Sequence, residues 1–256
     1  HRADSASNSL AAQIFNVRHN LFTGLRLFMK LFYLLLVLIS ISPISFGQTQ
    51  LNQKLRKELD SIYYEDQRYR ELLFSDLLKK KADSITQFYK IDKKDLSNYL
   101  MTTLQKVDST NLARIEEIIK EYGYPGKSLV GLPTNESTFF VLQHSNKIDK
   151  YLPIVEKAAL HGELPFQLYA MMLDRSLMYN GKEQIYGTQG KGIQITNPQT
   201  GEKMFKMIIW PIKDPRSVNE LRKNVGFKET VEENAKRLNI IYEIITLSQV
   251  KEIEGK

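Results

Sequence analysis

The sequence has 256 residues, of which 36 are Lys or Arg and 29 are Asp or Glu, giving a formal net charge of +7. With 42% apolar residues, 13 Gly and no Cys, the composition excludes a disordered chain, a collagen-like chain and a disulfide-stapled scaffold. The basic excess would suit a nucleic-acid or anionic-membrane partner only if the charges were clustered.

Residues 29–47 have the three-part pattern of a secretory signal peptide: a positive charge, an apolar run and small residues at the end. The apolar stretch 31–46 contains Pro43 and is shorter than the roughly 20 apolar residues that a membrane-spanning helix needs. We therefore predict a signal peptide cleaved between Gly47 and Gln48, and a retained membrane anchor is the alternative.

Residues 1–28 contain no Met and precede the Met that opens this pattern, so we expect them to be spurious upstream translation. The expected exported chain, periplasmic or secreted, is one domain over residues 48–256. Residues 1–47 hold four basic residues and one acid, so removing them lowers the net charge from +7 to +4. The lysine runs at 79–81 and 93–94 fit solvated helix faces, and we expect no nucleic-acid partner and no stable membrane insertion after cleavage.

Helical periodicity dominates the first part of this domain. Residues 51–81 lack Gly and Pro and repeat apolar residues at three- and four-residue steps, which predicts one long amphipathic helix. Residues 122–131 are predicted to form an ordered loop. Further helices are predicted at 93–105, at 111–121 with Ser109 or Thr110 as the cap, at 134–147, at 149–161 and at 165–180.

The pattern changes after residue 183. Residues 184–186 and 203–210 flank a Gly-rich stretch, which predicts two or three short strands forming a hairpin. Helices are predicted again at 218–224 and 229–247. The fold class is therefore predicted as mainly α (α+β), a single helical domain with one small antiparallel β-hairpin.

Asp66 and Arg70 stand on the apolar face of the first predicted helix. At 100° per residue both fall within about 20° of Leu59, near the centre of the apolar stripe, and Gln67 flanks them. They are four residues apart and can pair, but a buried pair is costly unless it is fully hydrogen-bonded. The group is either a structural ion pair or a site lined by Asp66, Gln67 and Arg70.

The segment 139–144 is apolar nearly all round and ends in Gln143 and His144. This predicts a buried helix with two polar residues at its end. His144 is either a satisfied core histidine or a general base, because its unperturbed pKa lies near neutral pH. His161, next to Gly162, is predicted to cap a helix C-terminus.

Asp174 and Arg175 lie in the apolar helix predicted at 165–180. Arg175 projects among Leu and Met side chains, and a buried Arg needs a carboxylate or several carbonyl groups as partners. Asp174 lies on a neighbouring face, where it could hold a different partner.

Residues 184–189 read Gln-Ile-Tyr-Gly-Thr-Gln. As a strand, this segment places Gln184, Tyr186 and Thr188 on one face, and Gly187 permits a close backbone approach. Together with Gln189 they offer neutral donors and acceptors that suit a peptide or a sugar better than phosphate. An ordinary hairpin edge with a polar face is the alternative.

No motif indicates a metal or a cofactor, and we expect neither. The chain lacks the His-Glu-x-x-His zinc motif, and its two remaining histidines stand far apart in sequence. Ser128 lacks the Gly-x-Ser-x-Gly context of a hydrolase nucleophile, and Gly187–Gly192 lacks the spacing of a P-loop. The absence of Cys excludes a thiol nucleophile and a lipid anchor.

The ordered set Asp66-Gln67 with Arg70, Gly123-Tyr-Pro, Gln143-His144, Asp174-Arg175 and Tyr-Gly-Thr-Gln at 186–189 resembles the bacterial domain-of-unknown-function family 6624. The resemblance extends from about Leu55 to Gly226. One departure is Tyr124, where the family leads us to expect Trp. The resemblance implies which residues matter without implying a reaction.

Two functions remain open. The first is an exported helical binding domain whose polar pocket takes a neutral or anionic small ligand, a peptide or a glycan. The alternative is a cell-envelope hydrolase or transferase with His144 as base and Asp66 or Asp174 as acid or orienting group. In either case we expect the ligand contacts at Gln67, Arg70, Gln143, Arg175, Gln184, Tyr186, Gly187, Thr188 and Gln189.

Overall fold

The computed structural model describes residues 50–196 and 199–254. The described residues all belong to one compact unit. The expectations for residues 1–28 and for the signal peptide at 29–47 lie outside the described residues. The elements are α2 (Gln53–Phe74), α3 (Leu77–Tyr89), η1 (Lys93–Asp95), α4 (Leu96–Tyr122), α5 (Lys127–Val130), η2 (Thr134–Glu136), α6 (Ser137–Gln143), α7 (Ile148–Leu160), α8 (Phe166–Tyr179), β1 (Gly190–Thr196), β2 (Lys203–Ile209), α9 (Val218–Asn224), α10 (Val231–Arg237) and α11 (Leu247–Glu254).

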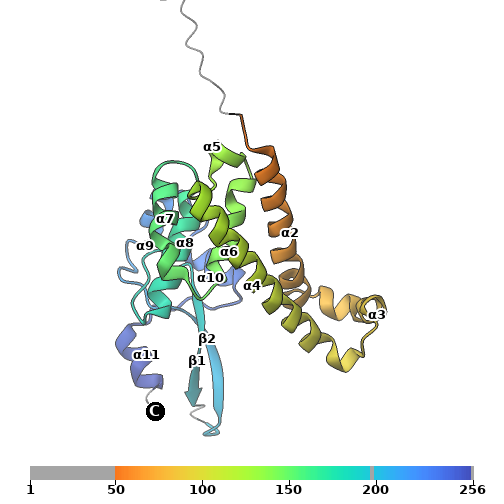
Figure 1. The fold of residues 1–256 in the computed structure, drawn as a ribbon. Coiled ribbons are helices and arrows are strands. Elements are labelled where there is room, and N and C mark those ends of the chain that lie inside the picture. The colour runs from red at the N-terminus through yellow and green to blue at the C-terminus, as the bar shows by residue number, and fades with distance from the viewer. Residues whose placement is uncertain (1–49, 197–198, 255–256) are drawn as a thin grey trace, which may run out of the picture. The chain divides into compact units, whose positions relative to one another are not determined.

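The two longest described helices, α2 and α4, pack against each other (Figure 1). Helix α2 begins at Asn52, whose side chain accepts a hydrogen bond from the backbone N–H of Leu55 at 3.0 Å. The apolar face of α2 packs against α4 and α6. Helix α4 ends at Gly123, whose φ of 73° is the left-handed value that glycine adopts readily.

The main core lies among α2, α4, α6, α7 and α8. Burying one large apolar side chain stabilises the fold by about 1.5–3 kcal/mol, so this cluster fixes the five helices against one another. In consequence the end of α6 is held beside α2 and α4. Fully buried members of the cluster include Leu59, Ile115, Phe139, Leu142, Val155 and Met172.

The two strands form a separate small layer below the helices in Figure 1. They pair antiparallel, with Gly190 opposite Ile209 and Thr196 opposite Lys203. Helix α11 packs against β1, and Val250 shares a core cluster with the strands. The predicted fold class, mainly α with one small antiparallel hairpin, is confirmed for the described part of the chain.

Two predicted helix boundaries were wrong, and a serine stands near each of them. The helix predicted at 51–81 breaks at Ser75, whose hydroxyl donates to the carbonyl of Glu71 at 2.5 Å and accepts from the N–H of Leu77 at 3.1 Å. The two helices predicted at 93–105 and 111–121 are instead one helix, α4. Ser109, expected to be a cap, donates to the carbonyl of Gln105 at 2.9 Å and stays within the helix.

Two further segments differ from the prediction. Residues 184–189 form a loop, and the first strand lies in the Gly-containing stretch 190–196. Gln184 makes only an isolated bridge to Ile212. The helix predicted at 229–247 ends after Arg237, because the chain turns at Asn239 with a φ of 57°, a left-handed value that Asn tolerates.

The helix predicted at 149–161 is α7, and His161 is its C-cap residue as predicted. The ring nitrogen Nδ1 of His161 lies 2.7 Å from the carbonyl oxygen of Lys157. Within residues 50–196 and 199–254, none of the helices combines the length and the apolar character needed to cross a lipid bilayer.

Candidate functional site

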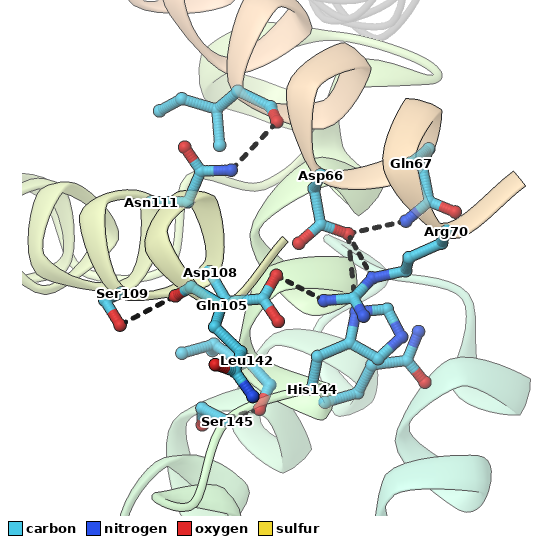
Figure 2. Close-up of polar contacts among 12 residues, drawn as sticks. Asp66, Gln67, Arg70, Gln105, Asp108, Ser109, Asn111, Leu142, His144 and Ser145 are labelled. Atoms are coloured by element: carbon cyan, nitrogen blue, oxygen red, sulfur yellow. Dashed lines mark hydrogen bonds and ion pairs between the residues drawn. The ribbon is translucent and has the colours of Figure 1, made fainter. Parts of the chain in front are cut away.

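Asp66 is the centre of a polar cluster between α2, α4 and the end of α6 (Figure 2). Its side chain is completely buried. Its Oδ2 atom accepts hydrogen bonds from Nε2 of Gln67 at 2.6 Å and from Nε of Arg70 at 3.4 Å, so the predicted pairing with Arg70 is observed. Its Oδ1 atom is buried without a hydrogen-bond partner in the described part of the chain. Such orphaned oxygens are rare in folded proteins and are found at functional sites.

Arg70 joins Asp66 to a second acid, Asp108 of α4. Its Nη2 atom donates to Oδ1 of Asp108, and the Arg70 side chain is only 16% exposed. Burial raises the pKa of Asp108, while the hydrogen bond and charge of Arg70 act in the opposite direction. A carboxyl group with a raised pKa keeps its proton at a higher pH than a solvated one, which suits a general acid.

His144 follows the last turn of α6 and faces the same acid. Its Nδ1 atom lies 3.3 Å from Oδ2 of Asp66, without the alignment of a hydrogen bond. Among the described residues its other nitrogen, Nε2, has no hydrogen-bond partner, and the ring lines a pocket. An imidazole with a carboxylate at Nδ1 and an unpaired Nε2 can exchange protons with a ligand.

We call this pocket the α4–α6 pocket. Its volume is about 260 Å³. Two apolar side chains and six polar ones line it, so most of the lining residues can form hydrogen bonds with a ligand. The polar residues are Gln105, Asp108, Ser109, His144, Ser145 and Asn146.

Arg175 of α8 forms a neighbouring polar group. Its Nε donates to Oε1 of Gln189 at 3.1 Å, and its Nη1 donates to the carbonyl of Gln143 at 3.0 Å. The predicted need for oxygen partners is thus met by neutral groups. Burial lowers the pKa of Arg175, and the positive charge of Arg70 adds to that effect. The two guanidinium groups are therefore close enough to interact electrostatically.

Asp174 has a different environment from Arg175. Its Oδ1 accepts from the N–H of Ile185 at 2.8 Å, and its Oδ2 accepts from the N–H and the hydroxyl of Thr188 at 3.0 and 2.9 Å. Burial raises the pKa of Asp174, and these hydrogen bonds oppose the rise. Since the N–H of Tyr186 also binds this carboxylate, the geometry fits an anchor for the loop 184–189.

Most hydrogen bonds of the loop 184–189 are made with the surrounding fold and not with residues of the pocket. Gln184 is fully buried, and its side chain donates to the carbonyls of Gln189 and Trp210 at 3.0 and 2.6 Å. The carbonyl of Gly187 accepts from Asn234 at 2.9 Å. These contacts leave Gln189, through Arg175, as the loop residue joined to the polar cluster.

Tyr186 also belongs to the packing of the loop. Its ring lies against that of Phe227, with centroids 6.4 Å apart. Its carbonyl accepts a hydrogen bond from Nη1 of Arg222 at 2.8 Å. The structure thus brings together Asp66, Arg70 and His144, and it places Tyr186 apart from them.

Sequence reasoning missed Asp108 and Arg222. The false break between two helices hid Asp108, which lies four residues after the buried Leu104 and seven before the buried Ile115, on the same face of α4. Arg222 is only 2% exposed and follows the buried Val218 by one helical turn. In both cases the available signal was a charged residue spaced so that it shares a helix face with buried apolar residues.

No curated protein and no solved structure matches the sequence. Residues 80–246, more than half of the chain, match the family of unknown function DUF6624, which confirms the resemblance. The match includes His144, Arg175 and the loop 184–189, whereas Asp66, Gln67 and Arg70 stand before it. By this match the chain belongs to the family of unknown function DUF6624.

Proposed function

We propose that this protein binds a small polar ligand in the α4–α6 pocket, with Asp108 and His144 as the titratable contacts. The main support is that both side chains line the pocket and that each has a charged neighbour on the side away from it. Arg70 holds Asp108, and Asp66 lies against Nδ1 of His144. Because Arg70 already binds its carboxylate, the Asp108 side chain loses little rotamer entropy when a ligand binds.

The lining chemistry favours a ligand with hydroxyl or amide groups. Gln105 and Asn146 supply amides, Ser109 and Ser145 supply hydroxyls, and Asp108 disfavours an anion. The volume of about 260 Å³ lies just below the roughly 300–1,000 Å³ of small-molecule sites, so it suits one sugar ring or a short peptide segment. We infer a neutral glycan or peptide group as the ligand.

The 3.3 Å contact between His144 and Asp66 favours a second function, an acid–base hydrolase or transferase. In this alternative Asp66 orients the imidazole, and Nε2 of His144 exchanges the proton of the reacting group. Asp108, with its pKa raised by burial, supplies or accepts a second proton. Asp174 has no part in this chemistry, because its hydrogen bonds hold the loop 184–189.

A melting-temperature screen against muropeptides, glycans and peptides tests the proposal, because a ligand that binds the folded state raises apparent stability. A ligand at 100 times its Kd stabilises by about 2.7 kcal/mol. We expect Asp108→Asn and His144→Gln to abolish the shift. Asp149→Asn, a change of the same charge at an exposed position on α7, should keep it.

A shift that survives both pocket substitutions would contradict the pocket assignment. Mass spectrometry of each bound ligand separates the two functions. Unchanged ligand indicates a binding domain, whereas turnover that disappears in His144→Gln indicates the acid–base enzyme.

We also propose that the protein acts outside the cytoplasm, in the periplasm or secreted, on the basis of the pattern in residues 29–47.

A further inference from the structure

A second pocket lies between α2 and the segment that leads into α6. Its volume is about 130 Å³, and it shares no lining residue with the α4–α6 pocket. We call it the α2–α6 pocket. Its polar and aromatic lining residues are Asp60, Tyr63, Thr134, Glu136, Ser137 and Phe140.

The wall of the α2–α6 pocket carries negative charge without a counter-charge. Asp60 accepts a hydrogen bond from the hydroxyl of Thr134 at 2.6 Å. Glu136 is half-buried, and its carboxylate forms neither a hydrogen bond nor an ion pair with the residues that the structure describes. Burial raises the pKa of Glu136, with no opposing contribution from a neighbouring base. No Lys, Arg or His is among the lining residues.

The same pocket has an aromatic side and a buried hydroxyl. The rings of Tyr63 and Phe140 meet edge to face, with centroids 5.1 Å apart and an interplanar angle of 61°. Ser137 lines the pocket at only 3% exposure, and its hydroxyl has no hydrogen-bond partner across residues 50–196 and 199–254. A hydroxyl at the wall of a cavity that binds no protein group is available to a ligand.

We propose that the α2–α6 pocket binds an organic cation, a protonated primary amine on a short apolar stem. An ammonium group carries three N–H donors, and the wall offers the carboxylates of Asp60 and Glu136 and the hydroxyl of Ser137 as acceptors. The rings of Tyr63 and Phe140 suit the stem and attract the charge. A Ca²⁺ ion needs six to eight oxygen ligands, which a wall that is partly aromatic does not supply.

The experiment is a titration of the protein with n-butylammonium chloride at pH 7, followed by the amide NMR resonances of residues 134–140. The neutral analogue 1-butanol has the same stem without the charge. We expect saturable shifts with the amine and none at the same concentration of the alcohol. Glu136→Gln should weaken binding of the amine by about tenfold or more, since it removes a charge-assisted hydrogen bond.

The matched control is Glu220→Gln, the same chemical change at an exposed position on α9, which should leave the titration unchanged. Asp60→Asn provides a second variant and should also weaken the amine. Equal shifts with 1-butanol, or undiminished binding in both pocket variants, would overturn the proposal. So would CaCl₂ alone, if it moved the same resonances at a lower concentration than the amine.

Discussion

Arg70 connects carboxylates that come from two helices. Its guanidinium group contacts Asp66 of α2 and Asp108 of α4, and its side chain is 16% exposed. Removing one member of a buried ion pair leaves the other charges uncompensated in a poorly solvated place. The side chain therefore has two effects, because it joins α2 to α4 and it sets the position of Asp108 at the pocket.

We predict that Arg70→Gln lowers the free energy of unfolding by about 2–4 kcal/mol, because the buried Asp66 and the partly buried Asp108 then lose their cation. Urea denaturation followed by circular dichroism measures the change. Arg114→Gln is the control. Arg114 pairs with Glu58 and Glu117 but is 40% exposed, so its loss should cost less than about 1 kcal/mol. Equal losses of unfolding free energy in the two variants would show that the ion pairs of Arg70 contribute no more than those of an exposed residue.

The sequence could predict contacts within one helix but not those between elements. The spacing of Asp66 and Arg70 predicted their pairing, because residues four apart lie on the same side of a helix. The approach of His144 to Asp66 depends on how α6 packs against α2, which no local pattern records. Likewise, adjacency in sequence could not show that Asp174 anchors a loop while Arg175 joins the polar cluster.

The loop 184–189 shows how one element depends on close packing. Gly187 has a φ of 64°, and a Cβ atom there would stand 2.6 Å from Cγ2 of Val231 and 2.8 Å from Cδ1 of Ile212. Both contacts are closer than carbon atoms tolerate. The loop therefore requires glycine for two reasons, its backbone conformation and the lack of space.

We predict that Gly187→Ala lowers the free energy of unfolding by about 2–4 kcal/mol, combining a left-handed backbone with overpacking. Gly181→Ala separates the two causes. Gly181 has the same φ of 64°, but no atom lies within 4 Å of its added Cβ, so only the backbone strain of about 1–2 kcal/mol remains. Thermal and urea unfolding of both variants measure the difference. Equal values would mean that Val231 and Ile212 give way without cost.

At the scale of whole elements, the sequence did not predict where two of the helices end. Ser75 and Ser109 each donate to the carbonyl four residues earlier, yet the chain breaks at the first and continues at the second. The difference lies in the tertiary contacts. After Ser75 the chain turns so that α3 can bury Ile85 against α4, whereas α4 is continuous along the main core. Residue preferences alone do not contain this information.

At the scale of the whole molecule, the polar cluster gathers residues from helices that are distant in sequence. α2 supplies Asp66 and Arg70, α4 supplies Asp108, and His144 stands at the end of α6. Helices α2 and α6 also border the α2–α6 pocket. Helix α6 therefore borders both candidate sites, and its packing against α4 and α2 positions them.

Export is the prediction that concerns the complete chain. We expect a tagged chain expressed in a bacterial host to be recovered outside the cytoplasm, and its intact mass to correspond to a first residue of Gln48. Leu35→Arg, which interrupts the apolar run of the signal pattern, should keep the chain uncleaved in the cytoplasm. Leu35→Ile keeps the run apolar and should be exported as before. An uncleaved chain in the membrane fraction would favour the anchor alternative, and an uncleaved cytoplasmic chain without any substitution would contradict export.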